Sequence, residues 1–166
     1  RTCYEQALEI DTRLGNPLGQ AQSLSNLGNV AREQGDYVAA RTCYEQALEI
    51  AKRLGNRLGQ AQCLGNLGVM AVGQGDYVAA RTYLERALEL HTRLGNPFDQ
   101  AQDLGNLGLA AINQGDYAAA HTYLERSAAL YRQIGVPVHP AVAQALDRLT
   151  KQDNGFWRRL WRRLQQ

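Results

Sequence analysis

The chain has no long apolar run, little net charge and no alternating strand pattern, and each absence excludes a class of protein. No stretch of about 18 apolar residues occurs, so nothing is predicted to span a membrane. The formal net charge is +2, which is too small to indicate a nucleic-acid partner. β-branched residues are sparse and do not alternate with polar ones, so no strands are predicted. The class of protein that these absences leave is a helical one.

Recognisable catalytic and ligand-binding spacings are also lacking. The three histidines, His91, His121 and His139, have no cysteine or carboxylate at metal-ligand spacing. No glycine-rich phosphate loop lies between a strand and a helix. We therefore predict no enzyme activity, no metal and no cofactor.

The feature that is present is a repeat of 40 residues. Residues 1–16 and 41–56 differ only at positions 11 and 12. Arg-Leu-Gly-Asn recurs at 13–16, 53–56 and 93–96, and Gln-Gly-Asp-Tyr at 34–37, 74–77 and 114–117. A period of this length indicates stacked supersecondary units, none of which can bury its apolar face alone.

Each repeat is predicted to hold two helices. Asn16 and Pro17 are typical of a helix start, Gly35 of a helix end, and Asp36 of a cap on a second helix that reaches about Leu54. The chain begins in the middle of a repeat, so we expect it to be part of a longer protein. The predicted elements are a lone second helix at 1–14, helix pairs at 17–54, 57–94 and 97–134, a capping helix at 137–152 and a basic amphipathic helix at 156–165.

The apolar and small residues of these helices resemble the tetratricopeptide repeat (TPR). The residues that carry the resemblance are Leu24, Leu27, Gly28, Gly35, Tyr37, Ala40, Tyr44 and Ala47. The 40-residue form, with Leu-Gly-Asn-Leu-Gly at 64–68 and 104–108, is similar to the repeats of the Leu-Gly-Asn spindle-orientation adaptor and kinesin light chain. The resemblance covers residues 1–136. It implies an all-α, right-handed α-solenoid of antiparallel helix pairs with C-terminal capping helices.

A polar stripe follows the first helix of each pair on the side opposite the predicted core. The resemblance implies that these first helices line a concave groove that binds a protein or peptide segment. Asn and Gln amides both donate and accept hydrogen bonds, so they can bind the backbone of an extended ligand. The alternative is that the amides bond a neighbouring helix or only reflect duplication of the unit. The predicted groove residues are Gln22, Asn26, Asn29, Glu33, Gln62, Asn66, Val69, Gln102, Asn106 and Leu109.

The C-terminal segment has the sharpest amphipathic pattern. As a helix it places Phe156, Trp157, Leu160, Trp161 and Leu164 on one side and Arg158, Arg159, Arg162 and Arg163 on the other. Three interpretations remain open: it caps the end of the solenoid, it pairs with another chain over the exposed first helix, or it lies in a membrane interface. Nucleic-acid binding is not predicted, because no basic stripe continues onto the repeats.

The three cysteines indicate the kind of cellular compartment in which the protein folds. Cys3 and Cys43 are equivalent residues of adjacent repeats, at an expected separation of roughly 8–10 Å, whereas a disulfide needs Cα atoms within about 7 Å. We predict that Cys3, Cys43 and Cys63 are small packing residues in a reducing, cytoplasmic compartment.

These patterns together predict a non-catalytic scaffold that binds a protein or peptide, of unknown identity, in the groove of the first helices. The alternative is an assembly element that forms a homo-oligomer or tethers to a membrane. It would act through the exposed first helix and the Trp/Arg segment, with membrane contact only through 156–165. A related alternative is the repeat arm of a larger signalling ATPase.

Overall fold

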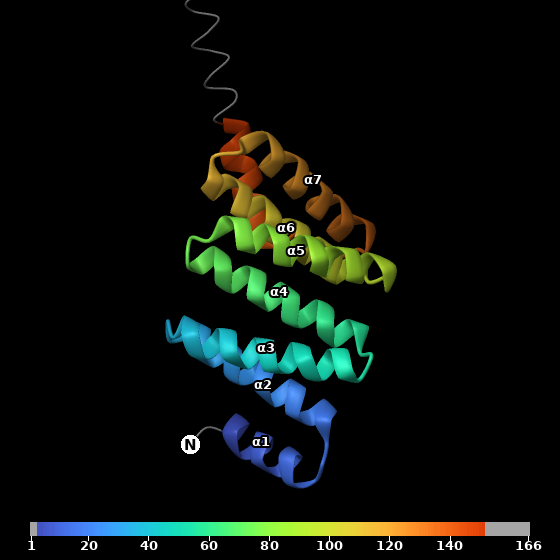
Figure 1. The fold of residues 1–166 in the computed structure, drawn as a ribbon. Helices are drawn as coiled ribbons and strands as arrows, with labels where there is room; N and C mark the ends of the chain where they lie inside the picture. The colour runs from blue at the N-terminus through green and yellow to red at the C-terminus, as the bar shows by residue number, and fades with distance from the viewer. Residues whose placement is uncertain (1–2, 152–166) are drawn as a thin grey trace, which may run out of the picture. The chain divides into compact units, whose positions relative to one another are not determined.

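The computed structural model describes residues 3–151 of the chain. These residues form an all-α helical-repeat solenoid, which confirms the predicted fold class (Figure 1). No helix within these residues is both long and apolar enough to cross a bilayer. The helices are α1 (Cys3–Arg13), α2 (Pro17–Glu33), α3 (Tyr37–Arg53), α4 (Arg57–Gly73), α5 (Tyr77–Arg93), α6 (Pro97–Gln114) and α7 (Tyr117–Gln133), followed by a helix at 140–151.

The helix ends are fixed by the short polar and glycine signals of the repeat. The side-chain oxygen of Asn16 accepts a hydrogen bond from the Gly19 amide at 3.1 Å, and Asp36 accepts one from the Ala39 amide at 3.0 Å. Each of these bonds satisfies a backbone donor that the helix itself leaves open. Gly35 has φ of 79°, the left-handed conformation that ends α2. Local chemistry therefore accounts for where these helices start and stop.

The chain forms two compact units, Arg1–Asn96 and Pro97–Gln166. In the first unit, α2 packs on α3 and α4 on α5, and α3 joins the two pairs by packing on α4. α2 also contacts α4, so the first helices of neighbouring pairs lie side by side (Figure 1). This arrangement brings the polar stripes of α2 and α4 next to each other.

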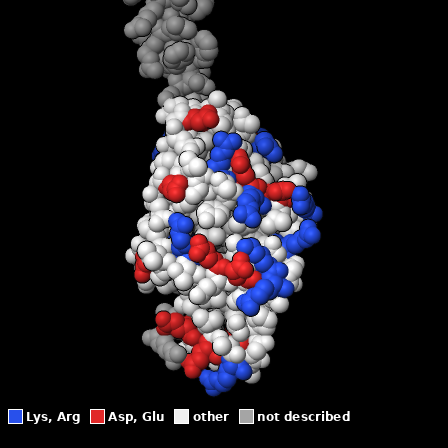
Figure 2. All heavy atoms as spheres, in the orientation of Figure 1, with Lys and Arg blue, Asp and Glu red and all other residues white. Residues whose placement is uncertain are grey.

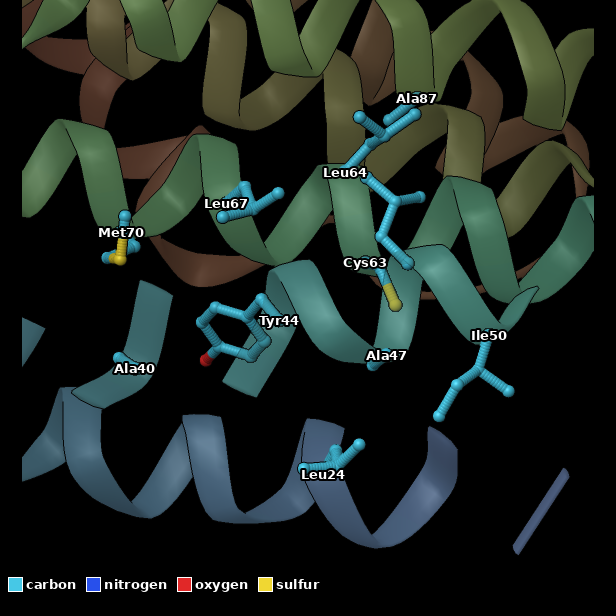
Figure 3. Close-up of a cluster of buried hydrophobic side chains, with 11 residues drawn as sticks. Leu24, Ala40, Tyr44, Ala47, Ile50, Cys63, Leu64, Leu67, Met70 and Ala87 are labelled. Atoms are coloured by element: carbon cyan, nitrogen blue, oxygen red, sulfur yellow. The ribbon is translucent and has the colours of Figure 1, made fainter. Parts of the chain in front are cut away.

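Helical glycines let the two helices of a pair approach closely. A Cβ atom at Gly28 would lie 2.6 Å from Cε1 of Tyr44, so the ring of this fully buried residue lies directly on the backbone of α2. Gly68 makes the same kind of contact with Leu84, because a Cβ atom at Gly68 would lie 2.5 Å from Cγ of Leu84. Figure 3 shows Tyr44 at the centre of the buried cluster, between Leu24 and Leu67. The close packing at these glycines offsets the free-energy cost of placing a glycine inside a helix.

The second unit consists of α6, α7 and the helix at 140–151. Leu124, Val142 and Leu149 are buried in its core. The last helix begins at 140, whereas the sequence pattern predicts a start at 137. Pro140 disfavours a helical conformation at His139, the residue before it, and itself suits the first position of the helix. The ring Nδ1 of His139 accepts a hydrogen bond from the Ala141 amide at 3.3 Å.

The three cysteines have different surroundings. All are free; Cys63 is buried, Cys43 is partly buried and Cys3 is exposed. The prediction that all three are packing residues is therefore wrong for Cys3. The reason is that no described helix covers that side of α1, in which no residue is buried.

Candidate functional site

In the first unit, the predicted groove residues of α2 are exposed or partly buried. Gln22 and Glu33 are exposed and Asn26 is partly buried. The amide of Gln22 lies 3.5 Å from the side-chain oxygen of Asn26, one helical turn away. These side chains are therefore available to a ligand.

Asn29 is partly buried like Asn26, but its side chain takes part in the packing of the helix pair. Its side-chain oxygen accepts a hydrogen bond from the Tyr44 hydroxyl at 2.8 Å. Tyr44 is fully buried, so its hydroxyl group needs a partner within the protein. This bond holds α3 against α2, and it corresponds to the structural alternative that the sequence left open for these amides.

The neighbouring stripe on α4 lies open in the same unit. Gln62 is exposed, and Asn66 and Val69 are partly buried. Because α4 contacts α2, the amides of Asn26 and Asn66 belong to adjacent first helices of one unit. The first unit thus presents two neighbouring polar stripes, with Val69 as the apolar member of the α4 stripe.

In the second unit, the predicted groove residues border a hollow of about 250 Å³, which we call the α6 hollow. α6 supplies part of its wall, the end of α7 another part, and the segment around 140 the rest. Its lining residues are Gln102, Gly105, Asn106, Leu109, Tyr131, His139 and Val142. All three predicted residues of α6 are therefore brought together, and none of the lining residues carries a fixed charge.

The chemistry of the α6 hollow is that of a neutral hydrogen-bonding site. His139 Nδ1 accepts from the Ala141 amide, so in the neutral ring the proton is on Nε2, which can donate to a ligand. The amides of Gln102 and Asn106 both donate and accept. Leu109 and Val142 provide the apolar part of the wall. A ligand group with one polar end and an apolar body is suited to this site.

Four lining residues of the α6 hollow were not predicted: Gly105, Tyr131, His139 and Val142. The sequence contained a signal for Tyr131, because this residue occupies the same position of the repeat as Ala51 and His91. For His139 and Val142 the sequence contained no signal, because they follow α7 outside the repeat. Gly105 lies at the contact with the last helix, where a Cβ atom would come within 2.9 Å of Val142.

A second hollow, of about 470 Å³, lies in the first unit along α3. Leu24 and Ile50 form its apolar part, and acidic and basic side chains surround them. Figure 2 shows acidic and basic side chains interspersed over the visible face. The other lining residues are Gln20, Thr42, Glu45, Gln46, Glu49 and Arg53.

The remaining predicted site residues belong to the C-terminal segment. Phe156, Trp157, Arg158, Leu160, Trp161 and Arg162 lie outside the described residues. Within residues 3–151 no group of three or more His, Cys, Asp or Glu side chains is arranged to hold a metal ion.

The buried Tyr44 hydroxyl group predicts a loss of stability in alkali. Burial raises the pKa of the Tyr44 phenol above its ordinary value, and a hydrogen bond with Arg32 acts in the opposite direction. The unfolded chain therefore releases this proton at a lower pH than the folded chain does. Stability is unaffected below a pH of about 10, the pKa of an unfolded tyrosine, and falls above it.

Urea unfolding at pH 8, 9.5 and 10.5 checks this expectation. We expect Tyr44→Phe to be less stable than the wild type at pH 8, by about 0.5–1.5 kcal/mol, because the bond to Asn29 is lost. The variant should then lose less stability than the wild type between pH 9.5 and 10.5. An equal loss in both proteins would contradict the assignment to Tyr44.

The class of protein follows from this geometry: antiparallel helix pairs with glycine-mediated contacts and accessible polar stripes on the first helices. The sequence profile of the tetratricopeptide repeat matches residues 1–53, 19–93 and 59–133. The chain belongs to the tetratricopeptide repeat family, whose repeats generally serve as protein-interaction scaffolds.

Several solved structures share the fold. BtubC (BKLC) from P. vanneervenii is 28% identical with a TM-score of 0.71, over 82% of this chain and 57% of that one, so this chain spans little more than half of its length. The TPR domain of Arabidopsis FLU is 20% identical with a TM-score of 0.63, over 68% of this chain and 95% of that one. A Rap protein, solved in complex with competence and sporulation factor, is 20% identical with a TM-score of 0.78, over 93% of this chain and 44% of that one. No match was found among curated proteins.

Proposed function

We propose that this chain is a non-catalytic scaffold that binds an extended peptide segment of a protein partner along the first helices of its repeats. The observation that carries the proposal is the α6 hollow, where Gln102, Asn106 and Leu109 form one wall. The same repeat positions on α4 are Gln62, Asn66 and Val69, which are also accessible. The repeats of α4 and α6 thus each offer two amides followed by an apolar side chain.

The size of the α6 hollow favours a side chain as its occupant. Sites for drug-sized ligands have volumes of roughly 300–1,000 Å³, and this hollow is smaller. It is suited to one side chain of a peptide whose backbone is bound by the amides beside it. Because the lining carries no fixed charge, a charged side chain would lose hydration here without compensation. We therefore propose an uncharged side chain with a polar end.

Selection of peptides tests this proposal. A displayed library of random 12-residue peptides is panned against the full chain, and the dissociation constants of selected peptides are measured for variants. We expect Asn66→Ala combined with Asn106→Ala to weaken binding about tenfold or more, because each lost hydrogen bond contributes about 0.5–1.5 kcal/mol.

The matched control is Thr122→Ala, an exposed position on α7 in the same unit as Asn106. It should leave binding unchanged, and circular dichroism should show equal helicity in all variants. The proposal is wrong if the library yields no binder, or if peptides bind the double variant as tightly as the wild type.

Location is part of the proposal. The three cysteines are free, as in a reducing compartment. We therefore propose a cytoplasmic scaffold.

A further inference from the structure

Tyr131 is a buried tyrosine whose hydroxyl group has no hydrogen-bond partner among residues 3–151. The residue is 3% exposed and borders the α6 hollow. Tyr44 shows the ordinary state of a buried tyrosine, because its hydroxyl group donates to the Asn29 side chain at 2.8 Å. A buried hydroxyl group without a partner lowers stability, and such groups are rare in folded proteins. The α6 hollow is the open space beside Tyr131, so a group bound there is its available partner.

The packing of Tyr131 holds its ring in a defined place. The ring lies edge-on against Phe98, with ring centroids 6.0 Å apart and an interplanar angle of 83°. Burial raises the pKa of the Tyr131 phenol, and the negative charge of Asp99 adds to this effect. The hydroxyl group therefore keeps its proton at neutral pH and can donate a hydrogen bond to a ligand.

The polar side chains around the α6 hollow define what its occupant must offer. Tyr131 and His139 each provide a donor, the hydroxyl group and the Nε2 proton, and neither carries a fixed charge. On α6, the amides of Gln102 and Asn106 each provide an oxygen that can accept. An occupant that satisfies all four groups needs a neutral oxygen with two lone pairs and two protons to donate.

We infer, on the basis of the proposed function, that the peptide side chain bound in the α6 hollow is a carboxamide, that of glutamine or asparagine. Its oxygen accepts from the Tyr131 hydroxyl group and from His139 Nε2, and its amino group donates to the oxygens on α6. Its apolar stem lies beside Leu109 and Val142. A hydroxyl side chain offers only one proton, and a carboxylate offers none.

Three displayed libraries of 12-residue peptides test this inference on the full chain. The central residue is fixed as a carboxamide (Gln or Asn), as the carboxylate of the same shape (Glu or Asp), or as Leu. We expect the carboxamide library to yield binders. Replacing the central residue of a selected peptide by its carboxylate counterpart or by Leu should weaken binding at least tenfold, because a charge is uncompensated in the hollow and Leu leaves its polar groups without partners.

Tyr131→Phe removes only the hydroxyl group and tests its part in binding. We expect this variant to bind the carboxamide peptides roughly three- to tenfold more weakly, and to bind their Leu-substituted versions as the wild type does. Tyr117→Phe is the matched control, because it makes the same change at a tyrosine of α7 that is 48% exposed, and it should alter neither affinity.

Thermal unfolding of the free protein provides a readout that does not depend on a ligand. Tyr131→Phe should leave the midpoint of unfolding unchanged or raise it, because no hydrogen bond within residues 3–151 is lost. A midpoint lowered as far as that of Tyr44→Phe would show that the Tyr131 hydroxyl group already has a partner in the fold, and would overturn the inference.

Failure of the carboxamide assignment is distinguishable from failure of the scaffold. If none of the three libraries yields a binder, both are wrong. If peptides with a carboxylate or Leu bind as tightly as those with a carboxamide, the assignment is wrong and the scaffold stands. The same holds if Tyr131→Phe binds the carboxamide peptides as tightly as the wild type does.

Discussion

Replacing Tyr44 by alanine is expected to lower the free energy of unfolding by about 3–5 kcal/mol, the usual cost of removing a buried aromatic ring. Tyr44 is fully buried, it fills the space above Gly28, and its hydroxyl group donates to Asn29. Loss of the ring leaves a cavity between α2 and α3, and the Asn29 oxygen loses its partner. Both effects act on the same helix pair.

The chain contains its own control for this substitution. Tyr4 occupies the same place in an identical sequence but is 41% exposed, so Tyr4→Ala should cost less than about 1 kcal/mol. Urea unfolding followed by circular dichroism measures both variants against the wild type. Equal losses in Tyr4→Ala and Tyr44→Ala would show that the close contact with α2 contributes little.

Replacing Gly68 by alanine is expected to destabilise the protein by up to about 2 kcal/mol, although alanine is the better helix former. The change gains up to about 1 kcal/mol in helix propensity. The new methyl group, however, would lie 2.5 Å from Leu84 Cγ and 3.3 Å from the backbone oxygen of Ala80. Leu84 is fully buried, so relief requires the two helices to separate, and overpacking of this kind typically costs about 1–3 kcal/mol.

Gly73 in the same helix is the matched control. It is exposed at the end of α4, and a Cβ atom there would lie 3.2 Å from the Tyr37 hydroxyl oxygen, the far end of a side chain that can turn away. Gly73→Ala should therefore leave stability unchanged or raise it by a few tenths of a kcal/mol. Urea midpoints of the two variants test the contrast, and a stabilising Gly68→Ala would show that α4 and α5 are not held at this distance.

The fold was predictable because its determinants are local and recur in register. Asn16 and Asp36 cap helices, and Gly35 ends one, through contacts within a few residues in sequence. The near-identity of residues 1–16 and 41–56 then shows that one unit is repeated. The last described helix begins at Pro140 and not at Pro137, because a proline disfavours a helical conformation in the residue before it.

The candidate site was only partly predictable. The periodicity of α6 places Gln102, Asn106 and Leu109 on one side, and the structure finds all three around one hollow. The opposite wall depends on where Tyr131 and His139 lie after the chain turns, which helical periodicity does not define. Likewise, no pattern in the sequence distinguishes Asn29, whose side-chain oxygen accepts a hydrogen bond from Tyr44, from Asn26, whose side-chain oxygen lies beside the Gln22 amide.

The sequence by itself determined where helices form and which residues share a helix side, because caps, glycines and periodicity act over a few residues. The tertiary structure alone decided whether a given side is core or surface. Residues 1–10 and 41–50 demonstrate this difference, since one identical sequence places its tyrosine in solvent in α1 and in the core in α3. The physical reason is that burial depends on a second helix, and only α3 has α2 packed against its tyrosine.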